Sequence, residues 1–343
     1  SLNTILIQIK NMSDLQFKNI FITGGTGYVG SELVPRLLEK GYSVKVYDLN
    51  IYGDTLADHT NLTKVMGDIR NKTKLAKEAK GAEAFIHLAC ISNDPSFDLD
   101  ERLGRSINFE AFAGVLEAAL EGGSRRFLLA SSTSQYGIKP LDEKVTEETK
   151  AEPITDYGKY KLKCEEKMKE HDLKDMEYTF IRPATLCGYA SRLRLDLSVN
   201  ILTMHALARK KITVFGGAQL RPALNIQDMA RFYEFLLEAP SEKVNKEAFN
   251  ICDSNLSISE YADLVKKTLG DNSISIETTQ SNDNRSYHVD ASKVRKKLGF
   301  SLEHSIEEAI LSIKEAHGQG KIKDGLNNPV YHNVKQMKLI NLI

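Results

Sequence analysis

The chain lacks the features that would place it in a membrane or on nucleic acid. No apolar run approaches the ~20 residues that a membrane-spanning helix requires. Its 46 basic and 46 acidic side chains balance, so no excess charge draws the protein to nucleic acid or to an anionic membrane. We therefore expect neither nucleic acid nor a membrane among its partners.

Cysteine is also scarce. The four cysteines, Cys90, Cys164, Cys187 and Cys252, are widely separated and form no CxxC pair. This distribution argues against a disulfide framework and against a zinc site, and it fits a reducing compartment. We expect a cytoplasmic protein that holds no metal ion.

The first segment has no basic leader and no small-residue cleavage site, so no signal peptide is predicted. Met12-Ser13-Asp14 resembles a native start, and the eleven residues before it resemble vector or leader sequence. We therefore expect residues 1–17 to lie outside the fold.

The length of 343 residues exceeds one average domain, and neither an internal repeat nor a long low-complexity linker divides the chain. In the first half, short apolar runs that predict buried parallel strands alternate with segments of helical period. The predicted strands are Asn19–Thr23, Ser43–Tyr47, Leu62–Met66, Ala84–Leu88, Arg126–Ala130 and Tyr178–Ile181. The predicted helices are Gly30–Lys40, Lys72–Ala79, Asn108–Glu121 and Tyr157–His171. This alternation predicts an α/β, Rossmann-type doubly wound parallel sheet, with ligands bound at the carboxyl ends of the strands.

The alternation ends after Arg182-Pro183. Helical segments are then predicted at Ser198–Lys210, Ile226–Glu238, Ser257–Gly270 and Ser305–His317, with strand-like runs at Ile212–Phe215 and Ser273–Glu277. This irregular mixture is typical of a smaller mixed α/β lobe packed over a cofactor. We expect residues 18–183 and 225–252 to form the sheet domain, and residues 184–224 and 253–335 to form the smaller lobe.

A glycine-rich turn joins the first predicted strand to the first predicted helix. Gly24, Gly27 and Gly30 have the spacing GxxGxxG. The first glycine permits a tight turn, the second lets a pyrophosphate approach the backbone, and the third lets the helix pack against the strand. The helix N-terminus then faces the phosphates with a partial positive charge. A glycine triad alone is a weak signal, because glycine-rich turns are common.

Acidic residues end the next two strands. Asp48 is placed to accept hydrogen bonds from ribose hydroxyls and to repel a 2′-phosphate, which favours NAD over NADP. The alternative is a structural turn followed by a chance acid. Asp68, in Gly67-Asp68-Ile69-Arg70, is placed to accept from an adenine amino group, although such an aspartate is more often a helix cap. His87, at the end of the fourth strand, is predicted to be a packed, hydrogen-bonded residue and not a metal ligand.

Tyr157 and Lys161 form a Tyr-x-x-x-Lys pair, whose side chains share one face of a helix. A free tyrosine has a pKa of ~10, too high for a base at neutral pH. The ammonium group and the positive nicotinamide are expected to lower that pKa. Isolated, the pattern occurs on any amphipathic helix. Tyr160 is predicted to be a packing residue.

A run of hydroxyl residues follows the fifth strand directly. Leu128-Leu129-Ala130 leads into Ser131-Ser132-Thr133-Ser134, and the carboxyl end of a parallel strand is where the ligand cleft opens. One of these hydroxyls is placed to hydrogen-bond a reacting oxygen beside Tyr157. Without Tyr157 and the glycine loop, the same run would be interpreted as a Ser/Thr turn.

Together these motifs resemble the extended short-chain dehydrogenase/reductase family, in particular its nucleotide-sugar epimerases and dehydratases of the UDP-glucose 4-epimerase kind. The resemblance covers residues 19–297 and depends on motifs in the family's order and spacing. They are TGGTGYVG, Asp48, GDIR, HLA, SSTSQYG, YGKYK and Arg182-Pro183. It implies an NAD-binding sheet domain and a nucleotide-sugar-binding lobe.

The resemblance implies a catalytic triad of Ser132, Tyr157 and Lys161, with Thr133 as a further sugar contact. It also implies that a set of residues contacts NAD: Gly24, Gly27, Tyr28, Val29, Gly30, Asp48, Asp68, Ile69, Leu88, Ala89, Cys90, Tyr157, Lys161 and Pro183.

On the substrate side, the resemblance points to Thr133, Thr185, Asn200, Arg221 and Arg285. Thr185 stands where the family usually has an asparagine, a departure that puts this contact in doubt. Asn200 matches a position that contacts the diphosphate, and Arg221 fits the family's diphosphate-binding arginines better than Arg285 does. Residues 214–216 resemble the strand that lies along the nucleotide base.

The reaction is indicated by the residues after Ser132. Family dehydratases carry an Asp-Glu pair there and decarboxylases a Glu, whereas this chain has Thr133-Ser134-Gln135. The absence of a carboxylate disfavours elimination, although Asp94 in the loop after the fourth strand could supply an acid. We therefore expect an epimerase that oxidises a nucleotide-diphosphate sugar transiently and reduces it on the opposite face, at C4 first and C2 second.

Several alternatives stay open. A 4,6-dehydratase, a 4-keto reductase or a simple dehydrogenase would use the same triad, and Asp48 argues mildly against an NADPH-dependent reductase. A more distant alternative is a non-catalytic NAD(H)-binding sensor or scaffold, although such proteins usually lose the tyrosine or the lysine. The resemblance also implies a homodimer formed through the helices predicted at Asn108–Glu121 and Tyr157–His171.

Overall fold

The protein is described here by a computed structural model, which covers residues 15–140, 142–281 and 286–340. Its centre is a parallel sheet with the strand order β11-β7-β5-β4-β1-β2-β3. The strands are β1 (Asn19–Thr23), β2 (Ser43–Asp48), β3 (Leu62–Met66), β4 (Ala84–His87), β5 (Arg126–Ala130), β7 (Glu177–Pro183) and β11 (Glu247–Ile251). The order runs outward from β1 in both directions, as a doubly wound sheet requires. The predicted fold class is therefore confirmed, and β11 is a strand that the sequence pattern did not predict.

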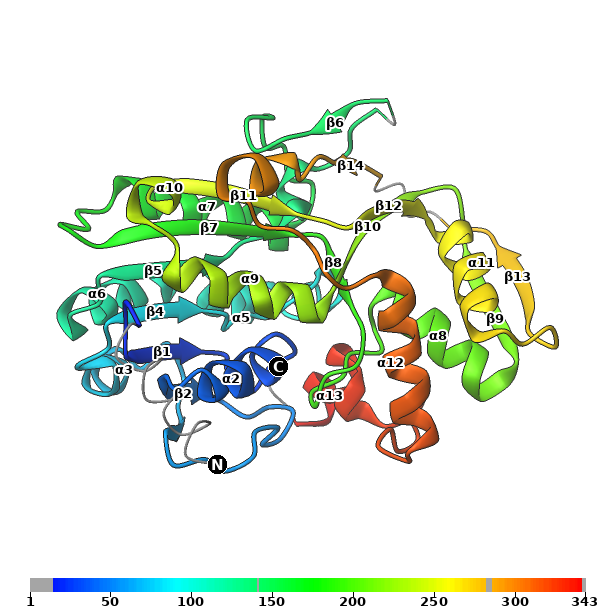
Figure 1. Cartoon of the computed structure of the whole chain (residues 1–343), viewed down its shortest axis with the longest axis horizontal. Helices are drawn as coiled ribbons and strands as arrows, with labels where there is room; N and C mark the ends of the chain where they lie inside the picture. Colours follow the sequence, from blue (N-terminus) through cyan, green and yellow to red (C-terminus); the bar gives the residue numbers. More distant parts are fainter. Residues whose placement is uncertain (1–14, 141, 282–285, 341–343) are drawn as a thin grey trace, which may run out of the picture.

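Helices cover both faces of this sheet (Figure 1). On one face lie α2 (Gly30–Glu39) and α9 (Ile226–Glu238). On the other face lie α3 (Lys72–Ala79), α6 (Phe112–Gly122) and α7 (Asp156–Glu170). Successive strand residues serve opposite faces, so Ile20 and Ile22 pack in the first core while Phe21 packs in the second. Burial of each such side chain contributes roughly 1.5–3 kcal/mol.

A smaller lobe lies beside the carboxyl ends of the strands (Figure 1). It contains a three-stranded sheet, a two-stranded sheet and helices that share a third core. Its elements are β8 (Thr185–Cys187), β10 (Leu220–Asn225), β12 (Ser254–Ser257), β9 (Lys211–Phe215), β13 (Ser275–Thr279), α8 (Ser198–Arg209), α11 (Ile258–Leu269) and α12 (Ile306–Gly318). Ser257 with Glu260 and Ser305 with Glu308 form capping boxes, which is why α11 and α12 begin where they do.

The remaining elements are short. They are α4 (Asp94–Phe97), α5 (Glu101–Arg105), η1 (Ser106–Glu110), η2 (Thr133–Tyr136), β6 (Lys144–Val145), α10 (Ser241–Val244), β14 (His288–Val289), η3 (Val294–Leu298), η4 (Pro329–Tyr331) and α13 (Asn333–Leu339). Two of them, β6 and β14, pair as a second two-stranded sheet. The predicted helix Asn108–Glu121 is in fact divided, because a π-helical turn, η1, ends at Glu110 and α6 starts at Phe112.

The predicted leader is partly wrong. Phe17 is only 2% exposed and packs in the first core, where the guanidinium carbon of Arg125 lies 5.0 Å from its ring centre. Burial of a large aromatic side chain explains why this residue belongs to the fold. The other part of that prediction, up to residue 14, lies outside the described residues. Within the part of the chain that is described, no helix is both long and apolar enough to cross a membrane.

Candidate functional site

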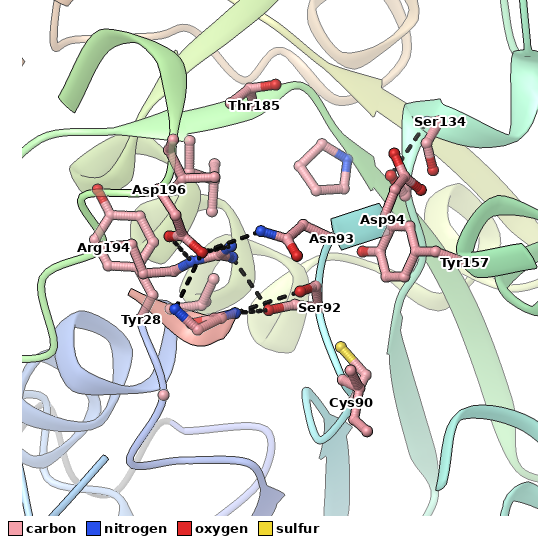
Figure 2. A pocket seen from close by; sticks show the side chains of 18 of the residues that line it. Tyr28, Cys90, Ser92, Asn93, Asp94, Ser134, Tyr157, Thr185, Arg194 and Asp196 are labelled. Carbon is pink, nitrogen blue, oxygen red and sulfur yellow. Dashed lines mark hydrogen bonds and ion pairs between the residues drawn. The ribbon is translucent and has the colours of Figure 1, made fainter. Parts of the chain in front are cut away.

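A cavity of about 680 Å³ opens at the carboxyl ends of the sheet strands and extends into the smaller lobe. This is the position at which doubly wound folds bind ligands. Both lobes contribute to its walls, and Figure 2 shows side chains from each of them directed into it.

The glycine loop forms one end of this cavity. Gly24 has a φ of +75°, and a Cβ atom there would lie 2.5 Å from the backbone nitrogen of Ala89. At Gly30 a Cβ would lie 2.2 Å from the carbonyl oxygen of Gly25. Only glycine allows these approaches. Tyr28 and Val29 line the cavity, and no side chain caps the start of α2. The loop therefore fits a dinucleotide's phosphates at an uncapped helix start.

Asp48 and Asp68 both line the cavity beyond the loop. Asp48 accepts hydrogen bonds from the backbone nitrogens of Thr26 at 3.0 Å and Asn50 at 2.9 Å, so its carboxylate is fixed against the glycine loop. Asp68 is paired with Arg70, with a shortest distance of 2.6 Å. The helix-cap interpretation of Asp68 is wrong, because Asn71 caps α3 by accepting from the nitrogen of Lys74.

Tyr157 and Lys161 both face the cavity from α7, whose start is capped by Thr155. The Nζ atom of Lys161 lies 5.7 Å from the centre of the Tyr157 ring and donates to the carbonyl oxygen of Ala130 at 2.6 Å. Lys161 is 8% exposed. Neighbouring Tyr160 stacks on Phe97, so it is a packing residue as predicted.

The Lys161 ammonium favours the Tyr157 phenolate as predicted, but burial opposes it. Burial raises the pKa of this phenol to about 12, although the Lys161 ammonium lowers it. Cys90 and Asp94 raise it as well. Among the protein groups, the cost of removing a phenolate from water therefore exceeds the attraction of one ammonium.

The hydroxyl groups that follow β5 make different hydrogen bonds. Ser132 accepts from the nitrogen of Ser134 at 3.1 Å and starts the turn η2. Thr133 donates to the carbonyl oxygen of Pro183 at 3.0 Å. Ser132, Thr133 and Ser134 all line the cavity. The structure thus brings Ser132 to the same cavity as Tyr157 and Lys161.

A buried ion pair between α7 and β7 lies next to this end of the site. Glu165 is fully buried on α7, and its Oε2 atom lies 2.6 Å from Nη2 of Arg182. Ser131 and Gln135 also donate to Glu165. This network joins α7 to the ends of β5 and β7 and so fixes the positions of Tyr157 and Ser132.

The remaining residues predicted to contact NAD also lie on the cavity wall, namely Gly27, Ile69, Leu88, Ala89, Cys90 and Pro183. His87 lies behind this wall and is bonded to Thr23 over 2.7 Å. Burial, and then the nearby Lys161 ammonium, lower the pKa of His87 to about 3. The predicted packed and hydrogen-bonded histidine is confirmed.

In the smaller lobe, Thr185 and Arg221 line the cavity, and so do Thr213 and Phe215 of β9. Val214, between them, points into the core. Asn200 is not on the cavity wall: its side chain bonds Gly188, Tyr28 and the carbonyl oxygen of Arg194. Arg285 lies outside the described residues.

Sequence reasoning missed a polar group on the cavity wall that contains two arginines and one carboxylate. Its members are Tyr52, Ser92, Asn93, Arg192, Arg194, Asp196 and Asn333. The alternation of charged residues with leucines from Arg192 to Asp196 was a signal for a segment with one charged face. No pattern pointed to Asn333.

Comparison with known proteins gives the same assignment as the motifs. The profile of the NAD dependent epimerase/dehydratase family matches residues 20–252. A UDP-glucose 4-epimerase of Lactobacillus helveticus is 26% identical over 323 residues, which are 87% of this chain and 96% of that protein.

Two solved structures share the fold. The UDP-glucose 4-epimerase of Thermotoga maritima with UDP-glucose has a TM-score of 0.78 at 23% identity, covering 88% of this chain and 99% of that one. The dTDP-glucose 4,6-dehydratase of Bacillus anthracis in complex with NAD has a TM-score of 0.78 at 19% identity, covering 91% of this chain and 99% of that one. The glycine loop fits the family's cofactor, which is NAD. The chain belongs to the NAD-dependent epimerase/dehydratase family.

Proposed function

We propose that this protein is an NAD-dependent nucleotide-sugar epimerase, acting at C4 of the sugar first and at C2 second. The observation that carries this proposal is the meeting of Ser132, Tyr157 and Lys161 on one cavity wall, beside a turn without a carboxylate at residues 133–135. The similarity to UDP-glucose 4-epimerases supports it.

Each member of the triad has a distinct role in this proposal. Bound NAD supplies a hydride acceptor and, in the return step, a hydride donor. Tyr157 takes the proton of the sugar hydroxyl that is oxidised and returns it when the carbonyl is reduced. Ser132 holds that oxygen by a hydrogen bond. Lys161, fixed by Ala130, stabilises the Tyr157 phenolate, whose formation burial opposes. The keto-sugar turns over between the two steps, so reduction on the opposite face inverts the carbon.

The substrate is proposed to be a nucleoside-diphosphate sugar whose sugar lies at Ser132 and Thr133. Its nucleotide extends into the smaller lobe, where β9 and Arg221 line the cavity. A guanidinium group suits a diphosphate because it offers several donors in one plane. A homodimer formed through α6 and α7 and a cytoplasmic location stay predictions.

Asp94 favours a second candidate function, that of a 4,6-dehydratase. This carboxylate lines the cavity, and Figure 2 shows it facing Ser134 and Tyr157. It therefore stands near the position where dehydratases of the family carry their acids. A 4-keto reductase or a dehydrogenase would use the same triad but would consume cofactor in each turnover.

Incubation with a panel of nucleotide sugars in heavy water, with no added cofactor and with NMR detection, distinguishes these functions. Formation of an epimer without deuterium on carbon supports epimerisation by the hydride cycle. Deuterium at C3 or C5 would indicate enolisation instead. A 6-deoxy-4-keto product that Asp94→Asn abolishes would favour the dehydratase.

Replacement of Tyr157 tests the role of the triad. Tyr157→Phe is expected to lower turnover by about 10²–10⁴-fold, the usual contribution of a positioned acid–base group, while NAD stays bound. Tyr160→Phe is the matched control, because Tyr160 packs on Phe97 and Phe109. Near-normal turnover in Tyr157→Phe would remove this residue from the mechanism.

A further inference from the structure

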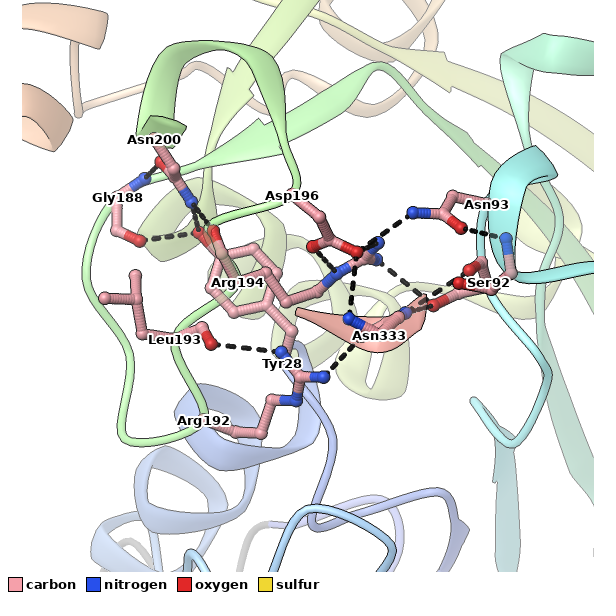
Figure 3. Close-up of polar contacts among 11 residues, drawn as sticks. Tyr28, Ser92, Asn93, Gly188, Arg192, Leu193, Arg194, Asp196, Asn200 and Asn333 are labelled. Carbon is pink, nitrogen blue, oxygen red and sulfur yellow. Dashed lines mark hydrogen bonds and ion pairs between the residues drawn. The ribbon is translucent and has the colours of Figure 1, made fainter. Parts of the chain in front are cut away.

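The polar group on the cavity wall contains two arginines, Arg192 and Arg194, and one carboxylate, Asp196, so it carries an excess of positive charge (Figure 3). Arg194 forms a two-point ion pair with Asp196, at 3.0 Å from Nε to Oδ1 and 3.1 Å from Nη2 to Oδ2. Asn93 also donates to Asp196, at 3.1 Å. The single carboxylate of the group is thus paired with Arg194.

Arg192 has no such partner. It is 3% exposed, and its guanidinium donates to the carbonyl oxygen of Leu193 at 3.0 Å and to the side-chain oxygen of Asn333. The guanidinium carbon lies 3.7 Å from the centre of the Tyr52 ring. In the described part of the chain, no aspartate or glutamate forms an ion pair with Arg192.

Burial of the Arg192 guanidinium is unfavourable in free energy without a neighbouring anion. Burial, and then the neighbouring Arg194, lower the pKa of Arg192, yet a guanidinium stays charged at neutral pH. A buried charge that lacks a counter-ion costs several kcal/mol. Because Arg192 lines the cavity, an anionic ligand there would offset that cost.

The position of Arg192 indicates which anion this is. Its backbone nitrogen donates to the hydroxyl of Ser31 at 3.2 Å, so the residue lies against the first turn of α2. Tyr28, in the glycine loop, donates to the carbonyl oxygen of Gly188 at 2.6 Å. The segment 188–196 therefore lies over the glycine loop, where a dinucleotide places its diphosphate.

Helix α13 holds this segment in place. The backbone nitrogen of Asn333 donates to Asp196 at 3.3 Å, and its side chain donates to the hydroxyl of Ser92 at 3.0 Å. Gln336 donates to the carbonyl oxygen of Ile51 at 2.8 Å. Asn333 is 2% exposed. The helix thus ties together the loop after β2, the loop after β4 and the segment that carries Arg192.

We propose that Arg192 binds the diphosphate of NAD, and that Asn333 of α13 holds Arg192 in position over this diphosphate. NAD is thereby retained between turnovers. Retention suits the proposed function, because an epimerase regenerates its cofactor in each cycle. The chemistry that Arg192 recognises is a diphosphate, which a nucleotide sugar also carries.

Cofactor binding tests the proposal without any assay of turnover. The amount of NAD that stays bound is measured by gel filtration followed by denaturation of the protein. Calorimetry then measures the affinities for NAD and for UDP of protein from which NAD has been removed (the stripped protein). Arg192→Met is expected to weaken NAD binding by roughly 10–100-fold, the range of a lost charge-assisted contact, and to leave UDP binding unchanged. Arg209→Met, an exposed arginine on α8, is the control.

The role of Asn333 in holding Arg192 is tested in the same way. Asn333→Ala is expected to release NAD at least about tenfold faster than the parent protein, while Lys338→Ala, exposed on the same helix, releases it at the parent rate. Arg192→Lys keeps the charge but not the planar group, so it is expected to bind NAD with intermediate affinity; it also serves if Arg192→Met does not fold.

Three outcomes would overturn the proposal. Unchanged NAD affinity in Arg192→Met would make the guanidinium structural. A loss of UDP binding with NAD binding intact would assign Arg192 to the substrate's diphosphate. Release of NAD from Asn333→Ala at the parent rate would show that Asn333 does not hold Arg192 over NAD. Failure of the epimerase proposal would appear only in the nucleotide-sugar panel, so the two failures are distinguishable.

Discussion

Two buried arginine clusters lie near α7, the helix that carries Tyr157 and Lys161, and they differ in their balance of charge. In the first cluster, Arg182 forms an ion pair with Glu165 of α7. Ser131 and Gln135 also donate hydrogen bonds to this carboxylate. On the cavity wall, Arg194 is paired with Asp196, whereas Arg192 donates to the oxygens of Leu193 and Asn333. The first cluster is balanced and closed, whereas the second carries an extra positive charge and opens to the cavity.

The difference shows how burial can be used for structure or for binding. A balanced pair specifies how α7, β5 and β7 meet, and it needs nothing from outside. An unbalanced cluster is favourable only when a ligand supplies the missing charge. His87 shows a third solution, because burial keeps its imidazole neutral and no counter-ion is needed.

Breaking the balanced pair is expected to have the largest effect. Glu165→Ala leaves the Arg182 guanidinium buried without its partner and should lower the free energy of unfolding by about 3–5 kcal/mol. Chemical denaturation measures this change. Glu166→Ala, at an exposed position of the same helix, should change it by less than about 0.5 kcal/mol. A loss in Glu165→Ala as small as that of the control would contradict a structural role for the pair.

His87 should make stability depend on pH. Its pKa is about 3 in the folded protein and 6.5 ordinarily, so the unfolded chain binds more protons between these values. Stability from this group is therefore complete above pH 6.5 and falls as pH decreases toward 3, with a loss of about 3 kcal/mol at pH 4.5. Denaturation of the parent and of His87→Gln across this range measures it; equal pH slopes in the two proteins would show that His87 does not titrate in this way.

The smallest effect on stability is expected at Arg192 in the absence of NAD. Arg192→Met removes a hydrogen bond to Asn333 and a contact with Tyr52, but it also removes a buried charge without a counter-ion. These contributions oppose each other, so the free energy of unfolding should change by no more than about 1 kcal/mol. A loss comparable to that of Glu165→Ala, measured on the stripped protein, would show that the two clusters do not differ as proposed.

Much of the fold was predictable because the sheet strands are short, apolar and buried on both faces. Asn19–Thr23 and Leu62–Met66 were predicted with the bounds that the structure has. β11 was not predicted, because Glu247-Ala248-Phe249-Asn250-Ile251 has a mixed pattern and becomes a strand only by pairing with β7. Phe17 was assigned to a leader, since nothing local shows that a lone aromatic residue fills a core.

The candidate site was predictable where its residues are close in sequence. The glycine loop, the Tyr157/Lys161 pair and the hydroxyl run are local patterns, and the structure brings them to one cavity. The effect of burial on the Tyr157 pKa was not predictable, because it depends on packing by residues far along the chain. The placement of Asn200 away from the cavity has the same origin, since Tyr28 and Gly188 occupy its amide.

The sequence by itself determined the doubly wound sheet, the glycine loop and the residue types of the proposed triad, since each depends on the chemistry of a few neighbouring residues. Only the tertiary structure decided which charges are balanced and which face the cavity. Arg192 and Asn333 are separated by 141 positions in the chain, and yet they are hydrogen-bonded. Such a contact depends on how several loops pack together, and no local pattern encodes that packing.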